Sequence, residues 1–219
     1  MKALAIDSAV TCISLAACNQ QKKASVTLDI GMRQSEKLIP AIEYVLEQVE
    51  LEASQLDFIA LSGGPGSFTG LRLGFAAAKG LQLSTGCAVY SIPTLQAQAE
   101  PYRSWPGKVI SAIDAKKDRF YVQFFFQGNE ISESLDIGVE EISRHLTNED
   151  NILIVGPDSE TLLHALKNFN PSLQVSRFPH LTTSITDALF SLGNKATENL
   201  APYQGPIYLR KSEAEENQK

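Results

Sequence analysis

The sequence predicts an α/β fold made of two duplicated domains, each a mixed β-sheet that opens with a hairpin and is packed with helices. The first observation is a repeated signature, because an apolar strand that ends at Asp7 recurs later as an apolar strand that ends at Asp114. The second is the Pro- and Gly-rich segment 90–108, which punctuates the chain between the two copies. We therefore predict an N-terminal domain over 1–100 and a smaller C-terminal domain over 101–219.

The first domain is predicted from periodicity. An apolar strand over 3–8 and its antiparallel return over 12–17 form the opening hairpin. Helical spacing of apolar residues predicts a helix over 35–49, with Ser35 as its candidate cap and Pro40 near its start. A buried strand over 58–61 follows, and then a helix of small residues that begins at Phe68 or Leu71 and ends at Leu83. Two glycines inside this helix each cost roughly 1 kcal/mol against alanine, so close packing is expected to offset them.

The second domain repeats this order. A hairpin is predicted from strands over 109–115 and 120–126, with a charged turn between them. The remaining elements are a strand over 152–155, helices over 159–169 and 184–200, a short edge strand over 207–210, and a charged tail over 212–219.

Composition limits the class of protein. The chain has 219 residues, of which 43% are hydrophobic, so it can bury a globular core. A net charge of -6 and a pI near 5.1 argue against independent binding to nucleic acid, which needs clustered Lys and Arg. Cys12, Cys18 and Cys87 lack CxxC spacing, which favours reduced thiols in a cytoplasm. No apolar run approaches the length of a membrane span, so we expect a cytoplasmic protein without a membrane contact.

The glycine-rich turn from Ser62 to Arg72 is the most distinctive segment. Such a strand-to-helix turn suggests a phosphate cradle, yet Gly70 is followed by Leu71 instead of the lysine of a Walker loop. The dinucleotide fingerprint also fails, because Thr69 stands where a glycine is needed. Two compatible interpretations stay open. One is a structural turn in which Gly63, Gly64 and Gly66 supply unusual dihedrals, Pro65 stiffens the bend, and Ser67 or Thr69 caps the helix; the other is a partner contact.

The run Gly64-Pro65-Gly66-Ser67-Phe68-Thr69-Gly70-Leu71-Arg72 is the hallmark of the TsaB (YeaZ) family, which the chain resembles over almost its whole length. Supporting matches lie at 5–8, 35–40, 114–121 and 206–210. One departure is Gln34, where family members often carry histidine. The resemblance also places the duplicated domains in the actin-like (ribonuclease H-like) superfamily of actin, sugar kinases and Hsp70.

The resemblance implies a non-catalytic subunit for the synthesis of N6-threonylcarbamoyladenosine at position 37 (t6A37) of tRNAs that read codons starting with A. The family binds and activates the TsaD transferase, supports recruitment of TsaE, meets tRNA only through the complex, and can form a homodimer when TsaD is absent. ATP and metal belong to the partner subunits, and the chain itself is expected to hold no cofactor. The family contact uses the first two helices, and its predicted partner-binding residues here are Lys37, Leu38, Ala41, Ile42, Val45, Leu71, Arg72, Gly74, Phe75, Ala78 and Leu81. The predicted structural loop consists of Gly64, Pro65, Gly66, Ser67, Thr69 and Gly70.

The residue chemistry agrees with a chain that has neither a catalytic nor a metal site. Nucleotide-binding members of the superfamily carry glycine beside the first aspartate, whereas Asp7 is followed by Ser8, Ala9 and Val10, which would crowd a phosphate. The three histidines, His145, His164 and His180, are far apart in sequence and lack metal-ligand spacing. Asp7 and Asp114 could be general bases, but an aspartate at a strand end more often bonds neighbouring backbone N–H groups, so we favour a structural role.

Three alternatives compete with the scaffold hypothesis at this point. The stripe Leu38, Ile42, Val45, Leu46 and Val49 would simply be buried in its own domain if the helix is an ordinary amphipathic one. An independent kinase-like or peptidase enzyme would need a nucleotide or metal site of its own. A stand-alone RNA-binding module conflicts with the acidic balance of the chain.

Overall fold

The computed structural model describes residues 1–147, 151–177 and 184–210. The chain forms two compact units, one of Met1–Thr94 with Ser184–Ile207 and the other of Leu95–Thr183 with Tyr208–Lys219. The change of unit after Thr94 falls inside the segment 90–108 where the boundary was expected. Residues 184–207 were predicted to belong to the second domain, but they return to the first unit because helix α6 (Thr186–Gly193) packs on its sheet.

The first unit contains a five-stranded mixed sheet in the order β3-β2-β1-β4-β5. β1, β2 and β3 are antiparallel, and β4 and β5 run parallel to β1. The strands are β1 (Lys2–Asp7), β2 (Ile13–Asn19), β3 (Lys22–Leu28), β4 (Phe58–Ser62) and β5 (Ala88–Ile92). The opening hairpin and β4 confirm the predictions, while β3 and β5 were not predicted. In β3, Ala24, Val26 and Leu28 alternate with exposed residues, so a period of two was present in the sequence.

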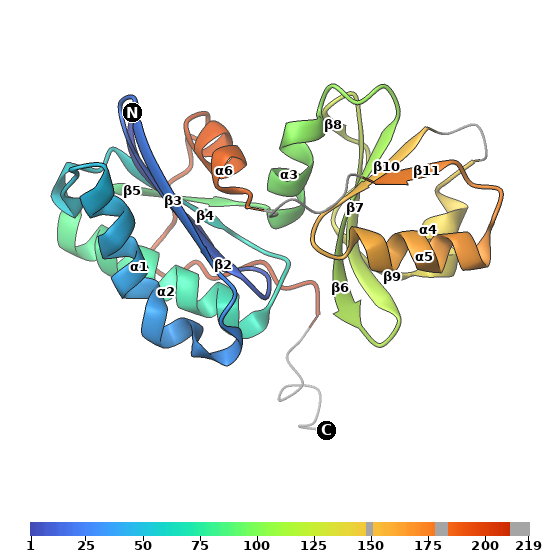
Figure 1. Cartoon of the computed structure of the whole chain (residues 1–219), viewed down its shortest axis with the longest axis horizontal. Helices are drawn as coiled ribbons and strands as arrows, with labels where there is room; N and C mark the ends of the chain where they lie inside the picture. Colours follow the sequence, from blue (N-terminus) through green and yellow to red (C-terminus); the bar gives the residue numbers. More distant parts are fainter. Residues whose placement is uncertain (148–150, 178–183, 211–219) are drawn as a thin grey trace. The chain divides into compact units, whose positions relative to one another are not determined.

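Three helices cover this sheet. Figure 1 shows α1 (Gln34–Gln48) and α2 (Phe68–Thr85) side by side on one face, and α6 on the other. Leu4, Ile6 and Ile59 point toward α1 and α2 and belong to their hydrophobic core. The alternate residues on the α6 side include Ala3, Ala5 and Ala60, whose small size lets α6 approach closely.

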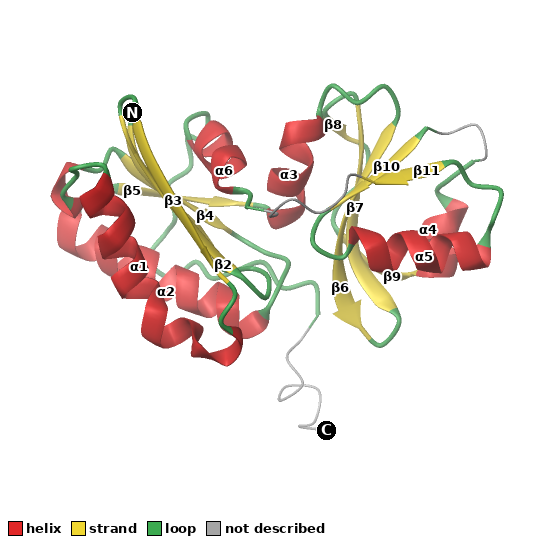
Figure 2. Cartoon of the chain, in the orientation of Figure 1, coloured by secondary structure: helices red, strands yellow, loops and turns green. Residues whose placement is uncertain are grey.

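The second unit contains a six-stranded sheet, in which five strands follow the order β11-β10-β6-β7-β8 and the sixth, β9, also pairs with β7. Figure 2 shows that this sheet, like the first, has helices on both of its faces. Its strands are β6 (Lys108–Lys116), β7 (Arg119–Phe126), β8 (Asn129–Glu130), β9 (Leu135–Gly138), β10 (Ile152–Val155) and β11 (Val175–Arg177). Its helices are α3 (Thr94–Ala99), α4 (Val139–Arg144) and α5 (Ser159–Phe169). Short 3₁₀ turns occur at Gly31–Arg33 and Ala53–Gln55 in the first unit and at Glu100–Tyr102 in the second.

The two sheets repeat one topology. In each, an antiparallel hairpin (β1–β2, β6–β7) is followed by a strand parallel to its first member (β4, β10) and then by a helix (α2, α5). The turn into that helix also repeats, because Gly64-Pro65 and Gly156-Pro157 both follow the parallel strand and the two glycines have φ of 101° and 102°. This repeat confirms the predicted duplication of two mixed α/β domains.

Several local predictions were wrong. Ser35 does not cap α1, which begins at Gln34 after a 3₁₀ turn and has no side-chain cap. The helix predicted over 184–200 ends at Gly193, because the following segment bonds to β5 through Leu200 N and Val89 O at 2.7 Å. No strand forms over 207–210; instead Ile207 N donates to Gly63 O at 2.8 Å. His180 and the tail 212–219 lie outside the described residues.

Among the described helices, none has the length and apolar composition needed to cross a bilayer.

Candidate functional site

The turn between β4 and α2, together with the first three residues of α2, is named the elbow here (residues 63–70). It is held by hydrogen bonds within its own unit. Gly63 N donates to Ile92 O at 2.6 Å and Gly64 N to Thr94 Oγ1 at 3.0 Å. Ser67 N donates to Ala9 O at 2.7 Å, and the Ser67 hydroxyl caps α2 by accepting from Gly70 N at 3.3 Å. These four amides are bonded within the chain and are therefore not available to a phosphate.

A row of glycines in the elbow and α2 lies against the β1–β2 turn. A Cβ on Gly66 would overlap the Ala9 carbonyl oxygen, and a Cβ on Gly70 would overlap that of Ser8. A Cβ on Gly74, one helical turn further, would overlap the Ser8 hydroxyl. The start of α2 therefore sits directly on the β1–β2 turn.

The role predicted for the elbow glycines needs a correction. Only Gly64 has a positive φ, at 101°, and the Gly64–Pro65 bond is cis. Gly63 and Gly66 are required by space, because a Cβ on Gly63 would overlap the Ser91 hydroxyl and one on Gly66 would overlap Ala9. The cap at Ser67 is confirmed.

Asp7 lies at the end of β1 and is only 2% exposed. Its Oδ1 accepts a hydrogen bond from Ala9 N at 3.1 Å, and Asp114 likewise accepts from Lys116 N at 2.7 Å, so both aspartates bond the backbone as predicted. Burial raises the pKa of Asp7 from 3.8 to about 6, although hydrogen bonds from Ala9 N and the Ser62 side chain oppose the shift.

Asp7→Asn is expected to stabilise the protein above about pH 6 by up to about 3 kcal/mol. The carboxyl of the unfolded chain loses its proton near its pKa of 3.8 and that of the folded chain only near about 6, so the wild type loses stability as pH rises between these values. Asparagine keeps an oxygen acceptor for Ala9 N but carries no charge. Urea denaturation of both proteins from about pH 4 to about pH 8 checks this; a stability difference that stays constant over this range would contradict it.

The two described histidines do not contribute to a metal site. The ring of His145 packs at 5.0 Å from the Phe124 ring, and His164 Nε2 lies 3.8 Å from Glu160 Oε1 on α5. Over residues 1–147, 151–177 and 184–210, no three His, Cys, Asp or Glu side chains are grouped closely enough to hold a metal ion. The described residues therefore do not fit the metal of a transferase.

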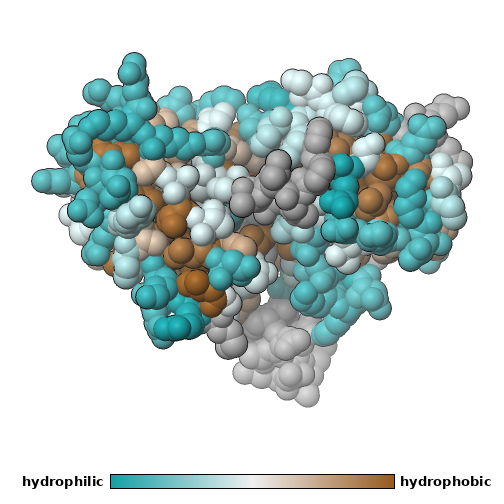
Figure 3. Space-filling view, in the orientation of Figure 1, coloured by the Kyte–Doolittle hydropathy of each residue, from teal (hydrophilic) through white to brown (hydrophobic). Residues whose placement is uncertain are grey.

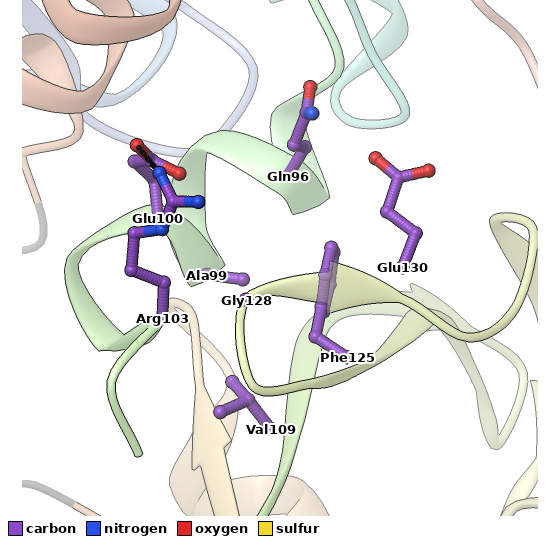
Figure 4. Close-up of a pocket in the computed structure, with 8 residues that line it drawn as sticks. All are labelled: Gln96, Ala99, Glu100, Arg103, Val109, Phe125, Gly128 and Glu130. Carbon is purple, nitrogen blue, oxygen red and sulfur yellow. Dashed lines mark hydrogen bonds and ion pairs between the residues drawn. The ribbon is translucent and has the colours of Figure 1, made fainter.

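A pocket in the second unit lies between α3 and the sheet (Figure 4). Its volume is about 30 Å³, which is room for one or two water molecules. Arg103 Nη1 and Glu100 Oε1 form an ion pair at 3.3 Å at its side. The lining residues are Gln96, Ala99, Glu100, Arg103, Val109, Phe125, Gly128 and Glu130. Its size excludes a nucleotide, whose site needs several hundred cubic ångströms.

The predicted partner-binding residues are mostly buried in the first unit. The inward set consists of Leu38, Ala41, Ile42, Val45, Leu71, Gly74, Phe75 and Ala78. Their apolar side chains pack on the sheet or on the other helix, so they cannot present a surface to another chain. The prediction is corrected for these eight residues, while Lys37 and Arg72 are exposed and Leu81 is half-buried.

The opposite faces of the same helices are open. On α2 the exposed residues follow a single helical stripe, namely Thr69, Arg72, Ala76, Gly80, Leu83 and Ser84. On α1, Ile39 and Tyr44 are about half exposed. Figure 3 shows apolar surface in the area of α1 and α2, bordered by hydrophilic residues. We name the α2 stripe together with the exposed side of α1 the outer face; sequence reasoning missed it, although the complement of the buried stripe would have indicated it.

Arg72 lies on the outer face, in the first turns of α2. Its guanidinium carbon stands 3.7 Å from the centre of the Phe68 ring, a cation–π contact.

Comparisons with known proteins show which family the chain belongs to. A family model described as TsaD, tRNA N6-adenosine threonylcarbamoyltransferase, matches residues 31–217. The "tRNA threonylcarbamoyladenosine biosynthesis protein TsaB" of Buchnera aphidicola subsp. Acyrthosiphon pisum is 32% identical over 120 residues. The chain belongs to this family, in its TsaB (YeaZ) branch. The aligned part covers 54% of this chain and 54% of the Buchnera protein, so the chain spans about half the length of that TsaB relative.

Solved structures place the TsaB branch within a known fold. "YeaZ from Pseudomonas aeruginosa" matches 95% of this chain and 99% of its own at a TM-score of 0.75, with 20% identity. A Bacteroides thetaiotaomicron protein "with actin-like ATPase fold and unknown function" matches 87% of this chain and 95% of its own at a TM-score of 0.50, with 15% identity. These likenesses confirm the predicted actin-like fold.

Proposed function

We propose that this chain is a non-catalytic subunit in the synthesis of t6A37 on tRNAs that read codons beginning with A. In this proposal it binds and activates the TsaD transferase and supports recruitment of TsaE. The family, and the name of the Buchnera relative as a tRNA threonylcarbamoyladenosine biosynthesis protein, support the pathway. The observation that carries the subunit role is the elbow, because four of its amides (Gly63, Gly64, Ser67 and Gly70) are bonded within the chain while the helix it launches keeps an open outer face.

The docking surface in this proposal is the outer face of α1 and α2. Small residues at Ala76 and Gly80 leave room for a partner helix to approach closely, and a Cβ on Gly80 would meet nothing within 4 Å. Ile39 of α1 adds apolar area beside this strip. Lys37 and Arg72 are retained from the sequence prediction as charged contacts at its edge.

Binding alone is sufficient for activation. A subunit that binds the active conformation of TsaD better than the inactive one shifts the population toward the active form by that difference in affinity. ATP and metal are then held by the partner subunits, and tRNA is met only through the assembled complex. The same outer face would hold two copies of the chain together as a homodimer when TsaD is absent. The protein acts in the cytoplasm in this proposal.

A reconstituted reaction tests the proposal. TsaD, TsaE, the enzyme that makes threonylcarbamoyl-adenylate, substrates and unmodified tRNA are incubated with and without the chain, and t6A is measured by mass spectrometry of the nucleosides. We expect t6A only when the chain is present, and none from the chain with the adenylate and tRNA alone. Equal t6A without the chain, or t6A from the chain alone, would contradict the proposed function.

A further inference from the structure

The segment 199–207, named the strap here, fastens the C-terminal part of the first unit to α2. Asn199 Oδ1 accepts from Val89 N at 2.8 Å and from Gln82 Nε2 at 3.0 Å, and so joins β5 to α2. Lys79 Nζ then donates to Pro202 O at 2.6 Å. The strap is therefore fixed to α2 at two positions, Lys79 and Gln82, which lie about one turn apart near the C-terminal end of the helix.

The strap turns tightly at the attachment to Lys79. Gln204 N donates to Ala201 O at 3.0 Å, and Ala201 N donates to Gln204 Oε1 at 3.2 Å, which closes a four-residue turn from both sides. Tyr203 lies inside this turn and is 93% exposed. An aromatic side chain is thus presented to solvent from a backbone that is held in place.

Leu83 of α2 is presented in the same neighbourhood. It follows Gln82, which bonds the strap, and lies four residues after Lys79, so Lys79 and Leu83 share one side of the helix. Its exposure is 90%. Leu83 and Tyr203 therefore flank the attachment at Lys79; these three residues are named the ridge. Two nearly fully exposed apolar side chains thus adjoin one attachment point, Leu83 along α2 and Tyr203 along the strap.

Charge indicates what the ridge would bind. α2 contains Arg72 and Lys79 and has no Asp or Glu between Phe68 and Thr85, in a chain whose net charge is -6. A partner that fits has apolar side chains for Leu83 and Tyr203, with carboxylates placed to meet Lys79.

We propose that the ridge is a second anchor of the docking surface, and that its occupant is an apolar, acid-flanked helix of the transferase partner. This inference rests on the proposed function and extends the outer face from α2 onto the strap. Tyrosine is enriched at binding hot spots, so Tyr203 is expected to contribute strongly when a partner covers it. Leu83 contributes apolar area that leaves water on binding.

The double variant Leu83→Ser with Tyr203→Ser tests the ridge by calorimetric titration of purified TsaD with the full chain. We expect the Kd to rise about tenfold or more with an unchanged melting temperature, since both side chains are exposed. Ile131→Ser is the matched control, because Ile131 is 52% exposed but belongs to the second unit, and its Kd should equal that of the wild type. Gln204→Ala loosens the turn and keeps Tyr203, so a smaller rise is expected.

Two results would overturn the inference about the ridge and leave the proposed function in place. If wild type and double variant bind TsaD equally well, the ridge is not an anchor, while the proposed function stands. If the double variant loses only self-association in sedimentation and keeps its affinity for TsaD, the occupant is a second copy of this chain. Absence of binding by the wild type would instead remove the proposed function together with the ridge.

Discussion

Gly70→Ala is expected to lower the free energy of unfolding by about 2–3 kcal/mol. The added Cβ would overlap the carbonyl oxygen of Ser8, which belongs to the backbone of the β1–β2 turn. Both groups are held, because α2 is capped at Ser67 and Ser67 N is bonded to Ala9 O at 2.7 Å. Relief of the overlap requires the helix and the hairpin turn to separate, which gives up buried contacts on both sides.

Gly80→Ala is the matched control in the same helix. Gly80 is exposed and a Cβ there would meet nothing within 4 Å, so the change should stabilise the helix by up to about 1 kcal/mol. Urea denaturation followed by circular dichroism measures both variants against the wild type. If Gly70→Ala is as well tolerated as Gly80→Ala, the close contact of α2 with the turn does not exist in solution.

Much of the fold follows from patterns that lie within short stretches of sequence. The hairpin strands around Asp7 and Asp114 are apolar runs broken by polar turns, and such local signals are sufficient to predict their pairing. The stripe that predicted α1 is buried against the sheet as its period requires. The repeat of a hairpin in both halves was visible for the same reason.

The rest depends on contacts between residues far apart in the chain. Gly63, Gly64 and Gly66 were predicted to supply unusual backbone dihedrals, which is confirmed for Gly64. Gly66, and Gly70 with it, are instead required by the carbonyls of Ala9 and Ser8, about sixty residues earlier. The return of α6 to the first unit is another such contact, because Gly193 packs closely on Ala60. These contacts join residues that are far apart in the sequence, so no pattern within a short stretch predicts them.

The predicted partner site shows the same limit. Gly74 and Ala78 suggested a close helix partner, and the structure supplies part of it inside the unit, where Gly74 meets the Ser8 side chain. Composition showed that α2 is packed closely, but could not distinguish its own hairpin turn from another protein. The exposed stripe centred on Ala76 was overlooked because small residues of α2 occur both on its buried side and on its exposed side.

Ala76→Glu is expected to weaken binding to TsaD about a hundredfold or more while it leaves folding unchanged. Ala76 is exposed in the middle of the outer stripe, so glutamate has room in the free chain and is a good helix former. In the complex the same carboxylate would be buried between closely packed helices. Arg72 lies four residues earlier on the same stripe, but the bulk of glutamate at the contact and the desolvation of its charge would still oppose binding.

Thr161→Glu is the control for added charge. It places the same carboxylate on an exposed position of helix α5, in the second unit. Its affinity for TsaD and its melting temperature should match those of the wild type. A parallel loss in both variants would point to a general effect of charge instead of a local interface.

The central claim is that this chain acts by docking a transferase through the outer face of α1 and α2. Isothermal titration of purified TsaD with wild-type chain and with Ala76→Glu tests it most directly. The proposal predicts saturable binding of the wild type and none of the variant at the same concentrations. Equal binding of the two proteins, or no binding of the wild type, would contradict it.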